Sequence, residues 1–162
     1  MNGSSSNELK EHYLYPGNIF VDVKPYRITT ILGSCVSVCL WDTRLKIGAM
    51  NHFILPLWNG NGLATPKYGN IAIKKIIDKM LTLGSQKKDL VAKIFGGAAV
   101  LNTSNNKFNI GDRNVSVAFD FIREEKIPIV SQDVGGLTGR KILFFTNTGR
   151  VFGKLLGQTK SK

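Results

Sequence analysis

The chain has 162 residues, of which 43% are hydrophobic and 20% are charged, a composition typical of a soluble globular domain with one sizeable core. Lys and Arg number 22 against 11 Asp and Glu, so the net charge is +11, which favours acidic partners. No stretch approaches the roughly 18 apolar residues of a membrane span, and the Ser-rich start has no apolar secretory segment. We therefore expect a cytoplasmic protein without direct membrane insertion.

The basic residues are spread along the whole chain. There is no run of five or more Lys and Arg, and there is no recognisable DNA- or RNA-binding motif. We therefore expect no nucleic-acid partner, and an acidic protein surface is the better match to the charge.

The first third of the chain favours strands. Residues 1–11 are polar and predict a disordered lead. The short apolar and β-branched runs that follow predict strands, because such side chains suit a half-buried pleated surface. These strands are expected at residues 19–23, 28–32, 36–41 and 47–55. Residues 58–69 carry the run Asn59-Gly60-Asn61-Gly62 and Pro66, and they predict a loop.

Two helices are predicted from apolar spacing. Residues 70–83 place apolar side chains three and four positions apart, with Asn70 as the expected N-cap and Gly84 beyond the end. Residues 111–125 repeat the pattern with a second buried stripe.

The last third again favours strands. They are expected at residues 91–95, 127–130, 142–146 and 151–155, with the last two forming a hairpin. Residues 158–162 predict a flexible tail, so residues 12–157 form a single domain. Strands outnumber helices and do not alternate with them regularly, which predicts the α+β class, with two main helices packed on mixed, largely antiparallel sheets.

Cys35 is a candidate nucleophile. It follows Gly33 and Ser34, and a flexible backbone there can present its sulfur at a turn. His52 follows 17 positions later in a second apolar run, and a turn at residues 42–46 would bring the two strands together. A histidine is the usual base for a cysteine nucleophile. The alternative is that Cys35 is a small core residue, the commonest fate of a lone cysteine, and Cys39 is interpreted in that way.

Several motifs, in consistent order, carry a resemblance to a known family. The chain runs L-G-S-C-V-S-V-C-L-W-D, then G-A-M-N-H-F-I-L-P, and later G-G-A, I-G-D-R-N and D-V-G-G-L-T-G-R-K. From about residue 12 to residue 155 it closely resembles the CheD family of chemoreceptor glutamine deamidases. Neither glycine stretch fits a phosphate-binding loop, and turns or close backbone approach explain them better.

The resemblance implies a fold and three site residues. The fold is a layered α/β sandwich. The family's catalytic cysteine and histidine fall on Cys35 and His52. A threonine six residues before the cysteine is implicated in the family's active site and falls on Thr29, whose hydroxyl would hold the histidine or the substrate amide. Alternation along the strand places Thr30 on the opposite face.

The implied function is a protein-glutamine deamidase in chemotaxis adaptation, a cysteine-dependent amidohydrolase without a metal or organic cofactor. It would convert specific glutamines of chemoreceptor cytoplasmic helices to glutamate through a thioester, and the same route could cleave receptor methyl esters. The alternative is a non-catalytic adaptor that binds a CheC-type phosphatase or receptors. In the family, the segment after G-G-A is implicated in contacts with CheC and often continues with a methionine and a large apolar residue. This chain differs there, with Val100 and Leu101 after Ala99.

Overall fold

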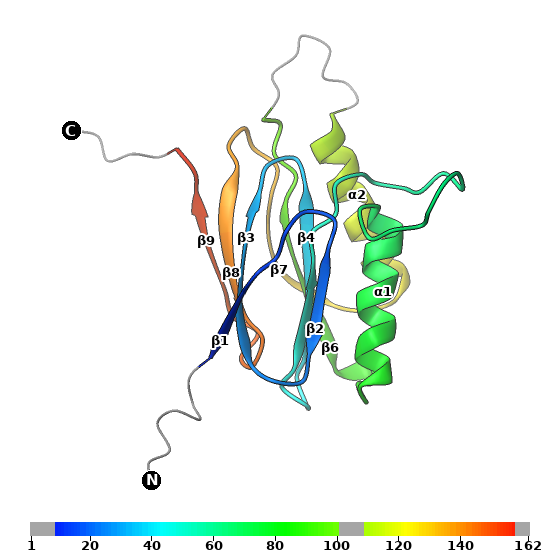
Figure 1. Ribbon diagram of the computed structural model, residues 1–162, viewed down its shortest axis with the longest axis vertical. Helices are drawn as coiled ribbons and strands as arrows, with labels where there is room; N and C mark the ends of the chain where they lie inside the picture. Colours follow the sequence, from blue (N-terminus) through cyan, green and yellow to red (C-terminus); the bar gives the residue numbers. More distant parts are fainter. Residues whose placement is uncertain (1–8, 101–108, 158–162) are drawn as a thin grey trace, which may run out of the picture.

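A computed structural model of the chain describes residues 9–100 and 109–157. The described elements form three layers, with an outer sheet, a central sheet and a pair of helices (Figure 1). The outer sheet has the strand order β1 (Lys10–Tyr13), β3 (Tyr26–Leu32), β8 (Arg140–Phe145) and β9 (Val151–Leu155). The central sheet has the order β2 (Ile19–Asp22), β5 (Gly48–Asn51), β4 (Val36–Asp42), β6 (Leu90–Gly96) and β7 (Ile129–Val134).

Both sheets are mixed. β1 pairs with β3 and β6 pairs with β7 in parallel, whereas all other neighbouring strands are antiparallel. The predicted α+β class and the layered sandwich with largely antiparallel sheets are confirmed. β1 begins at Lys10, inside the range that the sequence predicted as a disordered lead, because its backbone pairs with β3.

The two main helices cover one face of the central sheet. α1 (Gly69–Thr82) and α2 (Ile110–Glu124) each lie within a residue of their predicted bounds, and a short 3-10 helix, η2 (Lys87–Asp89), precedes β6. The predicted Asn70 cap is wrong: Tyr68 is the N-cap of α1, without a side-chain bond, and the Asn70 side chain accepts from Trp58 N instead. No helix in the described ranges has the length and apolar character to span a membrane.

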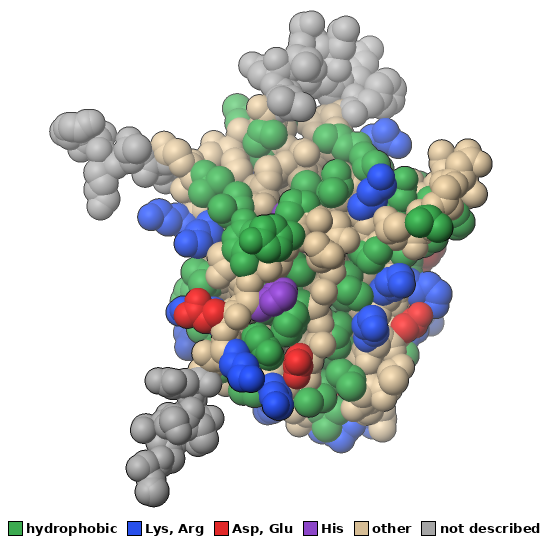
Figure 2. All heavy atoms as spheres, viewed as in Figure 1, with side chains coloured by type: hydrophobic (Ala, Val, Ile, Leu, Met, Phe, Trp, Pro, Cys, Tyr) green, Lys and Arg blue, Asp and Glu red, His purple; other side chains and the backbone are tan. Residues whose placement is uncertain are grey.

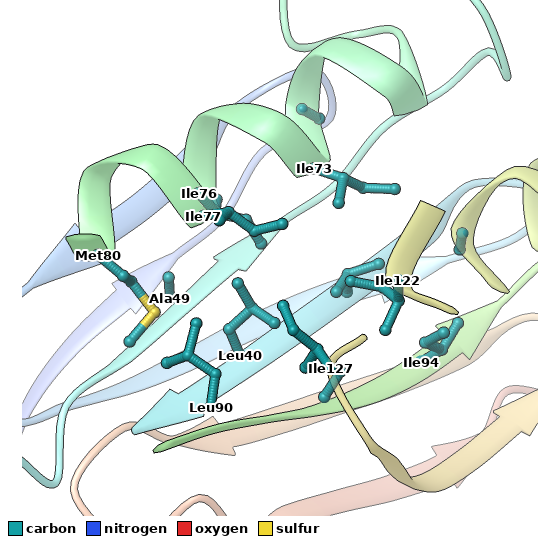
Figure 3. Close-up of a cluster of buried hydrophobic side chains, with 14 of the residues drawn as sticks. Leu40, Ala49, Ile73, Ile76, Ile77, Met80, Leu90, Ile94, Ile122 and Ile127 are labelled. Atoms are coloured by element: carbon teal, nitrogen blue, oxygen red, sulfur yellow. The ribbon is translucent and has the colours of Figure 1, made fainter. Parts of the chain in front are cut away.

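The helix-side core lies between the helices and the central sheet. Figure 3 shows α1 side chains pointing down onto β4 and β5, with residues of α2 and β6 beside them. Its buried members are aliphatic apart from one phenylalanine and one methionine. They are Val36, Val38, Leu40, Ile47, Ala49, Phe53, Ala72, Ile73, Ile76, Ile77, Met80, Leu90, Ala92, Ile94, Ala118, Ile122 and Ile127.

The inter-sheet core lies between the two sheets and is smaller. Strand alternation sends every second side chain of β3, β4 and β8 into it. Its buried members are Leu14, Ile28, Leu32, Cys39, Met50, Phe95, Ile142 and Phe144. Cys35 packs against this cluster from the end of β4.

The strand that follows the turn at residues 42–46 is shorter than predicted. β5 ends at Asn51, although the apolar run continues to Leu55. His52 N donates to Asn18 O, and Gly17 N donates to His52 O, so the backbone of His52 is bonded to the segment before β2. Phe53 makes one isolated bridge to Val36. The apolar run therefore leaves the ladder where the candidate histidine stands.

Candidate active site

Cys35 lies in the connection between the two sheets. Gly33 and Ser34 lead from the end of β3 in the outer sheet to Cys35, immediately before β4 of the central sheet. The carbonyl oxygens of Gly33 and Cys35 accept hydrogen bonds from Ala98 N at 2.9 Å and Gly97 N at 2.8 Å. Backbone N–H groups of the segment after β6 thus hold the turn. The Cys35 side chain is half-buried.

Gly96 and Gly97 let the end of β6 pack closely against the Cys35 turn and against α2. Both residues have positive φ, 110° and 74°, where L side chains are strained. A Cβ on Gly96 would lie 2.2 Å from Cys35 O, and a Cβ on Gly97 would lie 2.2 Å from Val115 Cγ2. This supports the interpretation of these glycines as packing residues and not as a phosphate loop.

The strand register places His52 diagonally across from Cys35. β4 and β5 pair Cys39 with Met50, and the bridge of Val36 to Phe53 keeps the same register. Continuing it puts Cys35 opposite Ile54, so that His52 is two positions away and its side chain leaves the same face. Diagonal neighbours have Cα atoms about 7–8 Å apart and Cβ atoms closer. The turn at residues 42–46 does join the two strands, with Lys46 N donating to Asp42 O.

The surroundings of His52 fix the position of its ring proton. His52 and Thr30 are buried, and Thr30 Oγ1 lies 2.7 Å from His52 Nδ1. The same hydroxyl donates to Leu14 O at 2.6 Å. A carbonyl only accepts, so that bond uses the single hydroxyl hydrogen, and Nδ1–H must donate to Oγ1. Neutral His52 therefore carries its proton on Nδ1 and leaves a lone pair on Nε2.

Thr30, not Thr29, contacts the histidine. Alternation along β3 buries Ile28, Thr30 and Leu32 toward the central sheet. Thr29 is only half-buried and lines a shallow depression on the outer face of the outer sheet, beside Ile31. The expectation that Thr29 holds His52 is corrected, because the even-numbered residues of this strand face the site. The motif spacing alone did not show which face of β3 would meet the second sheet.

Burial keeps both candidate groups neutral. Desolvation lowers the pKa of His52 to about 4. Desolvation also raises the pKa of the Cys35 thiol, and the residue's own backbone N–H lowers it by a smaller amount. Each group therefore disfavours its charged form. The resting pair is a thiol and a neutral imidazole, not a thiolate and an imidazolium.

The second cysteine has a different setting. Cys39 is buried in the inter-sheet core. Desolvation raises the pKa of its thiol far above the ordinary value, outweighing the nearby Lys93. This buried apolar environment agrees with the interpretation of Cys39 as a packing residue.

The Nε2 atom of His52 is free to accept a proton. It is buried and has no hydrogen-bond partner within residues 9–100 and 109–157, the Cys35 sulfur included. In resting enzymes the bond between nucleophile and base is often looser than in the reacting complex. Among the described residues, no three His, Cys, Asp or Glu side chains gather as a metal site would require.

Two buried side chains that the sequence did not identify hold the surroundings of the site. Asn114 of α2 is fully buried and donates from Nδ2 to Ser34 O and Ile54 O, both at 2.9 Å. Arg140 is also buried and donates to Asp133 O and Gly135 O. Both residues lie in quoted motifs, Asn114 at the end of I-G-D-R-N and Arg140 in D-V-G-G-L-T-G-R-K. The motifs did not show their roles, and the acceptors of Asn114 are 80 and 60 positions away.

Comparison with known proteins agrees with the residue pattern. The profile of the family described as "CheD chemotactic sensory transduction" matches residues 55–155. A protein named "Probable chemoreceptor glutamine deamidase CheD" from Trichlorobacter lovleyi is 48% identical over 162 residues, which cover 100% of this chain and 99% of that protein. Its namesake from Sulfurimonas denitrificans is 47% identical over 154 residues, with 94% of this chain and 99% of the relative covered. These two matches extend across the segment of the candidate site, which precedes the profile match.

Proposed function

The chain belongs to the CheD family, and from this premise we propose that it deamidates glutamine side chains of chemoreceptors in chemotaxis adaptation. One observation carries the chemistry. The buried His52 ring donates from Nδ1 to Thr30, and its Nε2 has no partner among the described residues. The β4–β5 register, continued by one step, puts the His52 side chain on the same face as Cys35. A cysteine with a base of fixed tautomer suits acyl transfer from a carboxamide.

The reaction begins with proton transfer. His52 Nε2 takes the Cys35 proton as the sulfur attacks the carboxamide carbon of the glutamine, so that the neutral resting pair becomes charged only during the attack. The tetrahedral intermediate collapses when the imidazolium returns the proton to the leaving nitrogen, which departs as ammonia. Water, deprotonated by the same nitrogen, then cleaves the thioester and leaves glutamate and the free thiol.

The oxyanion of the intermediate needs hydrogen-bond donors. The carbonyl oxygens of Gly33, Ser34 and Cys35 all accept bonds from surrounding groups. The N–H groups of Ser34 and Cys35 donate to no other residue among those that the structure describes. We assign these two amides to the oxyanion hole.

The proposed substrate is an acidic helical bundle. The +11 charge favours such a surface. On the face shown in Figure 2 the Lys and Arg side chains are dispersed and acidic ones are few. This distribution suits attraction of an acidic partner over a wide surface better than binding in one basic pocket. Glutamate methyl esters pass through the same acyl-enzyme, so receptor methylesterase activity is a corollary. Binding of a CheC-type phosphatase stays a prediction: Val100 is exposed, and Leu101 lies outside the described residues.

Peptide mapping of a receptor fragment tests the proposal. A purified chemoreceptor cytoplasmic fragment is incubated with and without the protein, digested and analysed by mass spectrometry. We expect discrete glutamines to become glutamates only in the treated sample. An unchanged fragment, with folded protein in excess, would overturn the proposed activity.

A further inference from the structure

Asn114 joins the two backbone segments that carry the candidate nucleophile and base. One hydrogen of its amide nitrogen goes to Ser34 O, directly before Cys35, and the other goes to Ile54 O, two residues after His52. Each bond is 2.9 Å long. A single side-chain amide thus connects a turn and a strand end that are separated by 20 positions in the sequence.

The bridge stands where the backbone ladder ends. Val36 and Phe53 exchange both backbone bonds, at 3.1 and 3.0 Å. In an antiparallel ladder the position next to such a doubly bonded pair, here Cys35 and Ile54, exchanges no bonds. The following position, Ser34 and Leu55, exchanges none either, because Leu55 N donates to Lys67 O. Ile54 N donates to Lys67 O, and Cys35 O accepts from Gly97 N, so each backbone turns to a different neighbour. Asn114 therefore provides the cross-connection at the level of the nucleophile.

The amide is held firmly by its helix. Asn109 caps α2, with its side chain accepting from Gly111 N and Asp112 N. Gly111 packs so closely on the backbone of Gly97 that a Cβ there would lie 2.5 Å from Gly97 O. The first turn of α2 is thus fixed against the same strand end that holds the Cys35 turn. Asn114 follows in the next turn and has no exposed surface.

Stability alone does not explain an asparagine at this position. Asn is a poor residue for a helix interior, because its side chain competes for backbone bonds. Its Oδ1 is also buried without a partner among the described residues, which is unfavourable. Local rules are most often broken at functional sites.

We infer that Asn114 is a positioning residue, which sets the separation of the Cys35 thiol and His52 Nε2 by fixing Ser34 O and Ile54 O to one amide. The inference rests on the proposed function. Two donors at this spacing are required: aspartate offers acceptors to two carbonyls, alanine offers nothing, and glutamine moves both donors outward by one methylene.

The test compares Asn114→Ala and Asn114→Asp with the matched control Ile122→Ala, which removes buried packing from the same helix without touching either carbonyl. Two quantities are measured at a temperature at which circular dichroism shows every variant folded. They are kcat and KM on the receptor fragment, and the rate of Cys35 alkylation by iodoacetamide at several pH values. His52→Gln defines the alkylation rate without the base.

We expect both Asn114 variants to lose roughly 10- to 100-fold in kcat with a small change in KM, since misplacement by about 1 Å can cost that much. Their alkylation rate at neutral pH should fall to the His52→Gln level, while Ile122→Ala stays near wild type. If the alanine and aspartate variants do not fold, Asn114→Gln keeps both donors and should retain structure but lose kcat and alkylation rate.

Three results would overturn the inference. They are wild-type alkylation and kcat in a folded Asn114→Ala, full activity in Asn114→Gln, and an alkylation rate that is insensitive to His52. The proposed function fails separately: if wild-type protein leaves the receptor fragment unchanged but alkylation depends on both His52 and Asn114, the positioning role stands and the substrate assignment falls.

Discussion

The helix-side core and the inter-sheet core lie on opposite faces of the central sheet and bury different kinds of side chain. The helix-side core is apolar throughout and contains no titratable group. The inter-sheet core contains Cys39, and buried Thr30 and His52 form their hydrogen bond between the two sheets. The same strand, β4, supplies both cores from alternate residues.

The difference shows how one sandwich separates stability from chemistry. Apolar burial by α1 and α2 holds β4 and β5 without imposing any dependence on protonation. The other face can then hold a desolvated imidazole and a thiol whose neutral forms burial favours. Perturbation of the helix-side core should therefore change the free energy of unfolding, whereas perturbation of the inter-sheet side should change the reaction.

The largest effect is expected from the two cysteines. Cys35→Ala should lower deamidase activity by about 10³-fold or more, because it removes the proposed nucleophile. Cys39→Ala should lower the free energy of unfolding by roughly 1–2 kcal/mol through lost packing and keep most of the activity. Receptor-fragment kinetics and urea unfolding check this pair. Equal inactivation of two folded variants would contradict the distinction.

The two threonines of β3 give the next largest contrast. Thr30→Val keeps the shape but removes the hydroxyl that accepts from Nδ1–H, so kcat should fall roughly 10- to 100-fold as the ring loses its tautomer and orientation. Thr29→Val, on the outer face, should leave kcat close to wild type. Steady-state kinetics of both variants decide between the faces, and a larger loss from Thr29→Val would reverse the assignment.

The sequence predicted where helices and strands lie better than which side of each strand faces the core. The spacing of Ile73, Ile76 and Ile77 sufficed for α1, since a helix has only one way to bury such a stripe. β3 is apolar or β-branched at every position from residue 28 to residue 32, so alternation did not show which threonine pointed inward. Asn114 ends the quoted I-G-D-R-N motif, but the sequence did not show its role, because its two acceptors come from the turn before β4 and from the strand end beyond β5.

The pH dependence of activity follows from the depressed pKa of His52. The imidazole must be neutral to accept the thiol proton, and its pKa is about 4. The acid limb of kcat/KM on a neutral glutamine peptide should therefore lie near pH 4, well below the ordinary value of about 6.5. An acid limb close to pH 6.5 would show that the ring is solvated.

The same pKa makes stability depend on pH. The unfolded chain protonates this histidine below about 6.5 and the folded chain only below about 4, so the free energy of unfolding should decrease as pH falls through that window. His52→Gln should lack this part of the decrease. Ile76→Val, in the helix-side core, should lower stability by the same amount at pH 7 and pH 5. A pH-dependent effect of Ile76→Val would break the separation of the two cores.

The smallest effect is expected from salt. Screening over a Debye length of about 8–10 Å weakens attraction between exposed charges but not chemistry at a buried pair. Raising salt should lower kcat/KM on the acidic receptor fragment several-fold and leave the rate on a short neutral glutamine peptide nearly constant. A parallel fall of both rates would assign the +11 charge another role.

Trapping the acyl-enzyme tests the central claim most directly. The protein is mixed with a glutamine substrate peptide, quenched in acid during turnover, digested and mapped by mass spectrometry. The account predicts the peptide, lighter by one ammonia, in thioester linkage to Cys35 in wild-type protein, and no adduct in Cys35→Ala. An adduct on Cys39, or turnover without any adduct under conditions that preserve thioesters, would contradict it.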